Sequence, residues 1–304
     1  MVDLTSPTEI KRIMDGLGRG FNKSLGQNFL IDKNVLSEIV SASGIDKSFG
    51  VIEIGPGIGT LTQELLKKAG KVVSIELDRQ IAGYLQKAFA FYDNFKIINA
   101  DALKIDLKEI IKNEFGDMPC AVVANLPYYI TTPLIMKFLE DGAQFESITV
   151  MIQKEVAKRL EAKCGTKDYG AITLAVNYYS NPEIITEVPP HCFMPAPKVT
   201  SAVIKLDVKN HTVPYVSNKE ELFKIIKASF GQRRKTLVNG LSSLYPNLAK
   251  EQLKSIIYDV ANNENIRGEQ LSLEQFIQIC ENIVKTFAIW QKCVIMLNEV
   301  IWFI

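Results

Sequence analysis

The sequence is poor in the residues that build metal sites and disulfide frameworks. It has five cysteines and two histidines in 304 residues, and no two cysteines show the Cys-x-x-Cys spacing of a zinc or redox motif. The sequence therefore predicts no metal site. An odd, scattered set of cysteines is typical of proteins from a reducing compartment, so we expect a cytoplasmic location.

A long apolar run and a strong excess of one charge are also lacking. The first seven residues have no basic or apolar region, so we expect no signal peptide. The most apolar segment, residues 287–304, is short and contains four interrupting polar residues, which argues against a transmembrane helix. Because the net charge is only +1, binding to a nucleic acid would have to depend on a local basic patch.

A glycine-rich turn follows the first clear strand pattern. Residues 51–54 form an apolar run, the turn at 55–59 reads GPGIG, and a helical pattern covers 60–69. A strand, a glycine turn and a helix open a nucleotide-type site, because Gly55 and Gly57 carry no Cβ to block a ligand. The spacing Gly-x-Gly-x-Gly differs from the Gly-x-Gly-x-x-Gly of dinucleotide-binding proteins.

Acidic residues end the next two predicted strands. A strand pattern over 71–75 ends at Glu76, and another over 95–100 ends at Asp101. The carboxylate of Glu76 can accept hydrogen bonds from a ribose diol, and that of Asp101 could accept one from the exocyclic amine of an adenine ring. Because open α/β sheets bind ligands at the carboxyl ends of their strands, we expect these side chains to share one site.

The tetrapeptide Asn125-Leu126-Pro127-Tyr128 follows a further apolar run at 121–124. The side-chain carbonyl of Asn125 can accept an N–H of an amino group on a flat ring. Pro127 biases Leu126 toward an extended conformation, which exposes backbone carbonyls, and Tyr128 offers a face for base stacking. Alone, the tetrapeptide fits a simple turn equally well, but its place after the glycine turn and the two acids favours an amine-binding site.

The order of the elements predicts two domains. Strand and helix patterns alternate from about residue 50 to 208, which indicates an α/β, doubly wound and mostly parallel sheet. It includes expected strands at 148–153 and 172–180 and an outer antiparallel strand at 199–207. After a linker at 210–218 the pattern is helical. We therefore expect an α/β domain at 1–208, a small all-α domain at 209–286, and an apolar extension at 287–304 to which we assign no function.

Together these motifs resemble class I S-adenosylmethionine-dependent methyltransferases, and in detail the ribosomal RNA adenine N6-dimethyltransferase family in its bacterial small-subunit branch. The resemblance covers roughly residues 23–285. Its motifs are KSLGQNFL at 23–30, EIGPG at 53–57, NLPYYI at 125–130, QKEVAKRL at 153–160, FMPAPKV at 193–199 and FGQRRK at 230–235. It implies a Rossmann-like methyltransferase fold for residues 1–208 and RNA binding by the helical domain.

The resemblance also implies an activity and its residues. It implies that two methyl groups pass from S-adenosylmethionine to N6 of adenines in 16S ribosomal RNA during small-subunit biogenesis, with the small subunit as partner. The expected cofactor-binding residues are Gln27, Asn28, Leu30, Gly55, Gly57, Glu76, Asp101 and Asn125. The expected catalytic residues are Asn125, Leu126, Pro127, Tyr128 and Phe193. Phe193 fits two interpretations, the second face of a base sandwich or the anchor of a proline-rich loop.

Basic residues are concentrated between 198 and 235, where nine lysines and arginines face three acids. We expect Lys198, Arg233, Arg234 and Lys235 to contact RNA phosphates, although a solvated helix face explains such a run equally well.

Three other functions stay open. A large-subunit rRNA dimethyltransferase of the antibiotic-resistance type is disfavoured by the motifs at 153–157 and 232–235. A DNA amino-methyltransferase is disfavoured by Leu126, where such enzymes commonly carry proline. A largely non-catalytic ribosome-assembly or transcription factor on the same scaffold is disfavoured by the intact set of site residues.

Overall fold

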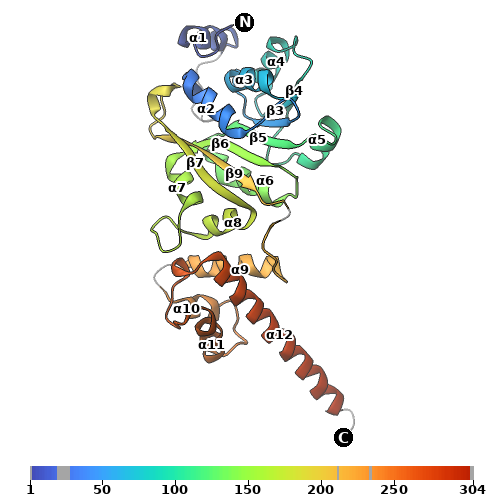
Figure 1. Cartoon of the computed structure of the whole chain (residues 1–304), viewed down its shortest axis with the longest axis vertical. Coiled ribbons are helices and arrows are strands. Elements are labelled where there is room, and N and C mark those ends of the chain that lie inside the picture. The colour runs from blue at the N-terminus through green and yellow to red at the C-terminus, as the bar shows by residue number, and fades with distance from the viewer. Residues whose placement is uncertain (1, 19–27, 211, 233–234, 302–304) are drawn as a thin grey trace. The chain divides into compact units, whose positions relative to one another are not determined.

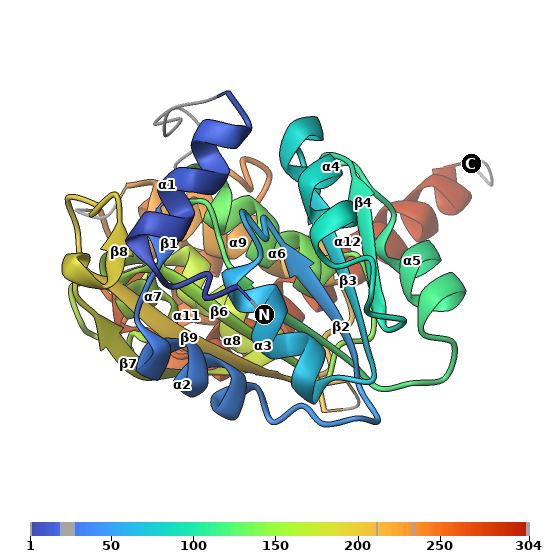
Figure 2. The ribbon, with the colours of Figure 1, turned by 90° about the horizontal axis from the view of Figure 1, so that it is seen from above.

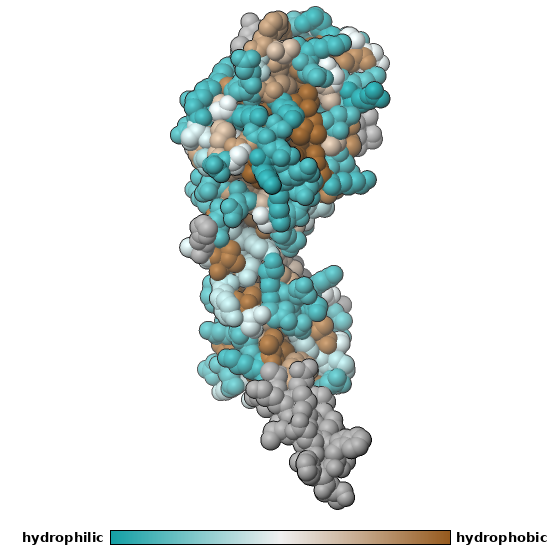
Figure 3. Space-filling view, turned by 90° about the vertical axis from the view of Figure 1, so that its right-hand side faces the viewer, coloured by the Kyte–Doolittle hydropathy of each residue, from teal (hydrophilic) through white to brown (hydrophobic). Residues whose placement is uncertain are grey.

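A computed structural model describes residues 2–18, 28–210, 212–232 and 235–301, with side chains as far as residue 287. The described chain divides into two compact units. The first comprises Met1–Glu161 and Tyr179–Thr212, and the second Ala162–Tyr178 and Val213–Ile304. The domain limits expected at residues 208 and 286 stay predictions. Figure 3 shows that hydrophilic residues cover most of the face in view, with smaller hydrophobic areas between them.

A seven-stranded mixed sheet forms the centre of the first unit (Figure 1), in the order β4-β3-β2-β5-β6-β9-β7. The five parallel strands are β2 (Gly50–Ile54), β3 (Lys71–Glu76), β4 (Phe95–Asn99), β5 (Cys120–Asn125) and β6 (Ser147–Gln153). Two antiparallel strands complete it, β9 (Ser201–Val208) and β7 (Ser180–Val188). The mixed, mostly parallel α/β sheet expected from the sequence is confirmed.

The strand order reverses between β2 and β5. The chain builds β2, β3 and β4 outward to one edge, then returns to place β5 on the other side of β2. At such a switch point the connections leave the two strands in opposite directions, and a crevice opens at their carboxyl ends. The glycine turn after β2 and the tetrapeptide that begins at Asn125 are therefore brought to the same crevice.

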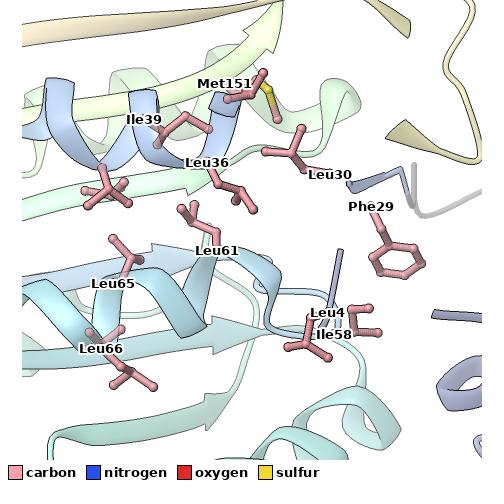
Figure 4. Close-up of a cluster of buried hydrophobic side chains, with 14 of the residues drawn as sticks. Leu4, Phe29, Leu30, Leu36, Ile39, Ile58, Leu61, Leu65, Leu66 and Met151 are labelled. Atoms are coloured by element: carbon pink, nitrogen blue, oxygen red, sulfur yellow. The ribbon is translucent and has the colours of Figure 1, made fainter. Parts of the chain in front are cut away.

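Helices pack on the sheet, and the cap of one helix holds the chain in place where strand β3 ends. Helix α2 (Lys33–Ser43) packs on β5 and β6, α3 (Thr60–Lys68) on β3, and α4 (Arg79–Ala88) on β3 and β4 (Figures 1 and 2). Leu36 and Ile39 of α2 and Leu61 of α3 belong to one buried hydrophobic cluster (Figure 4). Asp78 caps α4 through bonds from two backbone N–H groups, which fixes the chain just after Glu76.

The remaining elements of the first unit surround this frame. They are α1 (Pro7–Gly16), α5 (Leu107–Glu114), the 3-10 turn η2 (Tyr128–Ile130), α6 (Thr131–Glu140), α7 (Lys154–Glu161) and the 3-10 turn η3 (Pro190–Cys192). A separate two-stranded antiparallel sheet pairs β1 (Phe29–Leu30) with β8 (Phe193–Met194).

Two strand predictions were wrong. Residues 172–180, expected as a strand, lie mostly in helix α8 (Ala171–Tyr179). This segment is buried on several sides, and a short apolar run of that kind does not distinguish a strand from a buried helix. The strand expected at the outer edge near 199–207 is antiparallel but lies between β6 and β7, so β7 is the edge strand.

The second unit is helical. It contains α8, α9 (Lys219–Gly231), α10 (Leu237–Ser242), α11 (Lys250–Ala261), the 3-10 turn η4 (Gly268–Gln270) and α12 (Leu273–Ile301). The helical pattern predicts Leu222, Phe223, Ile226 and Ile257 as its core; Leu222, Ile226 and Ile257 are buried, whereas Phe223 is half-buried. The segment expected as an apolar extension continues α12 as far as Ile301. In the described part of the chain, no helix combines the length and apolar character needed to cross a membrane.

Candidate functional site

A pocket lies in the first unit at the carboxyl ends of the parallel strands. It is lined by the glycine turn after β2, the end of β3, the residues after β4, and the segment from Asn125 to Ile130. Leu30 of strand β1 and Asn28, the residue just before that strand, also border the pocket. Ten of the residues that the sequence singled out therefore share one cavity: Asn28, Leu30, Gly55, Gly57, Glu76, Asp101, Asn125, Leu126, Pro127 and Tyr128.

The glycine turn has the backbone geometry that its residues allow. Gly55 and Gly57 have φ angles of +64° and +57°, a left-handed region that side chains disfavour. A Cβ on Gly57 would lie 3.0 Å from Cε1 of Phe29, so the turn packs closely on the residue before Leu30. Gly55, Pro56 and Gly57 of this turn all line the pocket.

Glu76 is held at the end of β3 with only 8% of its surface exposed. Its Oε1 accepts the backbone N–H of Asp78 at 2.8 Å. Burial raises the pKa of Glu76, while hydrogen bonds from the backbone N–H groups of Asp78, Gly57 and Leu77 oppose that rise. The side chain is thus tied both to the helix cap that follows it and to the glycine turn.

Asp101 lies just after β4 and is partly buried at the pocket. Its Oδ1 accepts the backbone N–H of Leu103 at 3.0 Å, and its Oδ2 lies 3.5 Å from Nζ of Lys104. This loop arrangement fixes the carboxyl group beside the end of β3, where it shares the pocket with Glu76.

Asn125 is oriented by a contact with a residue 97 positions earlier in the chain. Its Nδ2 donates to the backbone carbonyl of Asn28 at 3.3 Å. Because the NH2 group of the amide is used there, the carbonyl oxygen is the part of the side chain that remains to accept a hydrogen bond. The backbone N–H of the following residue, Leu126, donates to Met151 O of β6 at 3.1 Å.

The rest of the tetrapeptide is a rigid turn. Leu126 borders the pocket but only 1% of its surface is exposed, so its side chain is held in the protein interior. Pro127 O accepts from Thr131 Oγ1 at 3.1 Å. The hydroxyl group of Tyr128 lies 2.6 Å from Oγ of Ser201 on β9, which holds the half-buried ring in place. No local sequence pattern indicates Ser201, because this partner of Tyr128 lies 73 positions away.

The other expected residues lie elsewhere. Phe193 is 3% exposed, belongs to the buried hydrophobic cluster and does not line the pocket. Lys198 and Lys235 are exposed and also lie outside it. Gln27, Arg233 and Arg234 fall outside the described residues. The roles expected for these six residues stay predictions.

A further acidic residue, Glu53 of β2, also lines the pocket. It is 1% exposed, and its Oε2 accepts from Thr62 Oγ1 at 2.7 Å and from Ser74 Oγ at 2.6 Å. Its Oε1 has no hydrogen-bond partner among the described residues. Burial raises the pKa of Glu53 to about 7, against the lowering effect of the two hydroxyl groups.

The charges of the pocket have one sign. Three carboxyl groups, those of Glu53, Glu76 and Asp101, line it, and the described lining residues include no lysine, arginine or histidine. The described residues also contain no cluster of three or more candidate metal ligands. Such a pocket disfavours phosphate-bearing ligands and favours a ligand that carries positive charge.

The buried Glu53 predicts an unusual pH dependence of stability. The folded protein binds the Glu53 proton more tightly than the unfolded chain does, so this group stabilises most below pH 4.5 and the contribution is lost as pH rises to about 7. We expect Glu53→Gln to remove this loss, which corresponds to about 3 kcal/mol of unfolding free energy. Urea unfolding of the unaltered protein and of Glu53→Gln at several pH values measures this difference in stability. Parallel pH profiles of the two proteins would contradict the prediction.

The order of the sheet and the pocket at its switch point define a Rossmann-like α/β fold. A family model described as ribosomal RNA adenine dimethylase matches residues 18–285. The chain belongs to this family. It is therefore an rRNA-modifying methyltransferase, and its fold is the one typical of S-adenosylmethionine-dependent methyltransferases.

Several individual proteins are similar over nearly the whole chain. Ribosomal RNA small subunit methyltransferase A of Alkaliphilus metalliredigens (strain QYMF) is 47% identical over 283 residues, which cover 93% of this chain and 99% of the relative. The protein of the same name from Clostridioides difficile (strain 630) is 46% identical over 283 residues, with coverage of 93% and 97%.

Solved structures agree with the fold. A dimethyladenosine transferase from Plasmodium falciparum superposes with a TM-score of 0.69 at 26% identity, over 83% of this chain and 95% of that one. The 23S rRNA methyltransferase ErmE has a TM-score of 0.65 at 24% identity, over 84% and 99%, and this likeness concerns the fold alone.

Proposed function

We propose that this protein transfers methyl groups from S-adenosylmethionine to N6 of adenines in 16S ribosomal RNA of the small subunit, giving N6,N6-dimethyladenosine. The observation that carries the proposal is the Asn125 amide, which lines a pocket with acidic walls and whose NH2 group donates to Asn28 O, so that its carbonyl oxygen remains to accept a hydrogen bond. The relatives named small subunit methyltransferase A support the choice of small subunit.

The pocket suits the proposed cofactor. Its three carboxyl groups favour a cationic nucleoside over a phosphate-bearing one, because the described lining residues supply no cation for phosphate. Glu76 would accept the ribose hydroxyls and Asp101 the adenine amine, while Gly55 and Gly57 allow close approach of the backbone. Asn28 and Leu30, with Gln27, would close over the methionine end. When bound, the cofactor supplies a methyl group on a sulfonium, a strong electrophile with a neutral leaving group.

The residues of the tetrapeptide would prepare the target amine. The lone pair of adenine N6 is delocalised into the ring, so the amine is a poor nucleophile until it is held near tetrahedral geometry. The carbonyl groups of Asn125 and Leu126 would accept its two N–H bonds and stabilise the positive charge that develops there. Holding the amine in line with the methyl group adds a proximity effect of about 7–11 kcal/mol. The proton can leave to solvent afterwards, so no general base is required.

The target adenine would have to leave its stack to reach the pocket. Tyr128 offers a face for it, and its bond to Ser201 keeps the ring from turning away. Phe193 is buried in the described structure, so the interpretation of this residue as a loop anchor gains support. We propose that Lys198, Arg233, Arg234 and Lys235 contact RNA phosphates, and that the protein acts in the cytoplasm on the assembling subunit.

The test is transfer of tritium from labelled S-adenosylmethionine to purified, under-methylated ribosomal subunits. We expect label in small subunits, and mass spectrometry of the nucleosides should show dimethyladenosine at long reaction times. Fully methylated small subunits serve as the matched control. Label in large subunits instead would favour the antibiotic-resistance type of activity, and monomethyladenosine alone would remove the second transfer.

A further inference from the structure

Glu53 is a buried acid in the pocket, and the proposed function assigns it no contact with the cofactor or the target adenine. Thr62 of α3 and Ser74 of β3 both donate to Oε2, so the two neighbouring hydroxyl groups satisfy one oxygen and leave Oε1 without a partner among the described residues. Glu53 lines the same pocket as the proposed cofactor site, one residue before β2 ends at Ile54.

The surroundings of Glu53 oppose a negative charge there. The charged groups that line the pocket with it are Glu76, at the end of β3, and Asp101, after β4; both are acidic, and Glu76 acts on Glu53. The other titratable groups of the lining are Tyr128 and Tyr129. A buried carboxylate without a positive partner is costly, so the neutral acid is favoured, and its pKa accordingly rises to about 7.

A cation in the pocket would favour the ionised form of Glu53 over the neutral form. We propose that Glu53 is a proton-linked positioning residue, which is protonated in the free protein and releases its proton from Oε1 to solvent when S-adenosylmethionine binds, so that the carboxylate becomes the counter-charge of the cofactor. The inference rests on the proposed function for the identity of the cofactor. No covalent bond of the cofactor changes in this step, and the released proton is taken up by buffer.

The proposal gives Glu53 a role in the reaction cycle. Methyl transfer converts the sulfonium into a neutral thioether, so the product, S-adenosylhomocysteine, lacks the charge that holds Glu53 in its ionised form. Glu53 then takes a proton from solvent, and the pocket has no carboxylate–sulfonium attraction with which to hold S-adenosylhomocysteine. Near neutral pH the residue therefore favours cofactor over product, which assists exchange of the one for the other.

Isothermal titration calorimetry in buffers of different ionisation enthalpy measures the protons released on binding. Because binding favours ionised Glu53, affinity should fall as pH drops below the pKa of the free protein. From about pH 8 to about pH 6 we expect the Kd for S-adenosylmethionine to rise roughly tenfold, with close to one proton released per molecule bound at the lower pH. S-adenosylhomocysteine should release clearly fewer protons and show a flatter profile.

Two variants make the assignment specific. Glu53→Gln keeps an acceptor for Thr62 and Ser74 but cannot ionise, so its proton release should vanish and its Kd should change less than about twofold over the same pH range. Glu64→Gln makes the same chemical change on α3, in an exposed ion pair with Lys67, and should behave like the unaltered protein. Proton release that survives in Glu53→Gln overturns the proposal.

The outcomes separate this inference from the proposed function. If S-adenosylmethionine binds without releasing protons, the role of Glu53 fails and the proposed function stands. If the unaltered protein does not bind S-adenosylmethionine at any pH, both fail. Should Glu53→Gln not fold, the unaltered protein decides the matter, because equal proton release with cofactor and product would overturn the proposal.

Discussion

Asn125→Ala is expected to lower kcat for methyl transfer about 100- to 1000-fold. The substitution removes the acceptor that we propose for the target amine, and deleting one preorganised hydrogen-bonding group from an active site typically has an effect of this size. The measurement is the initial rate of tritium transfer from S-adenosylmethionine to under-methylated small subunits. Circular dichroism and cofactor affinity should be measured beside it, because Asn125 also bonds Asn28 O.

Two further variants separate the roles of the Asn125 amide. Asn125→Asp keeps a carbonyl-type acceptor but loses the NH2 group that donates to Asn28 O, so it reports on the orientation of the side chain. Asn34→Ala changes an exposed asparagine in the first turn of α2, outside the pocket, and should leave kcat unchanged. A rate for Asn125→Ala within about threefold of normal would show that the amide does not act on the amine.

Glu76→Ala is expected to weaken S-adenosylmethionine binding at least tenfold. Hydrogen bonds to a charged group contribute about 1.5–3 kcal/mol, and we propose that the carboxylate accepts those of the ribose diol. It also holds the backbone N–H of Asp78 at 2.8 Å, so its loss would loosen the strand end. Isothermal titration calorimetry gives the Kd directly.

The matched control for Glu76→Ala is Glu64→Ala. Glu64 is partly exposed on α3 and pairs with Lys67 at 2.6 Å, and the pocket does not include it. Its substitution should leave cofactor binding within about twofold of normal, since surface ion pairs contribute little. An unchanged Kd for Glu76→Ala itself would exclude Glu76 from the cofactor site.

The parts of the site that could be predicted are those that lie at strand ends. Gly55, Glu76, Asp101 and Asn125 each follow an apolar run, and parallel strands bring their carboxyl ends to one edge, so the local pattern was sufficient to place all four in one pocket. Their individual roles stay predictions.

The errors arose where burial removed the pattern. In α8 the consecutive residues Leu174, Ala175 and Val176 are all buried, so neither the two-residue period of a strand nor the 3.6-residue period of an amphipathic helix is visible. The position of β9 inside the sheet depends on β7 pairing with its outer edge. This is a contact between different segments of the chain, and the alternation of apolar and polar residues along one strand does not predict it.

The amino-acid sequence by itself determined the α/β order of the elements, the glycine turn, the acids and amide that end the strands, and the membership of a family. Only the tertiary structure decided that Asn28 orients Asn125, that Ser201 holds Tyr128, and that Glu53 is enclosed with one oxygen unpaired. The reason is that hydrogen-bond geometry and desolvation are properties of the space between distant segments. Local residue patterns encode strand ends, but they do not encode which side chains meet there or how much water remains around them.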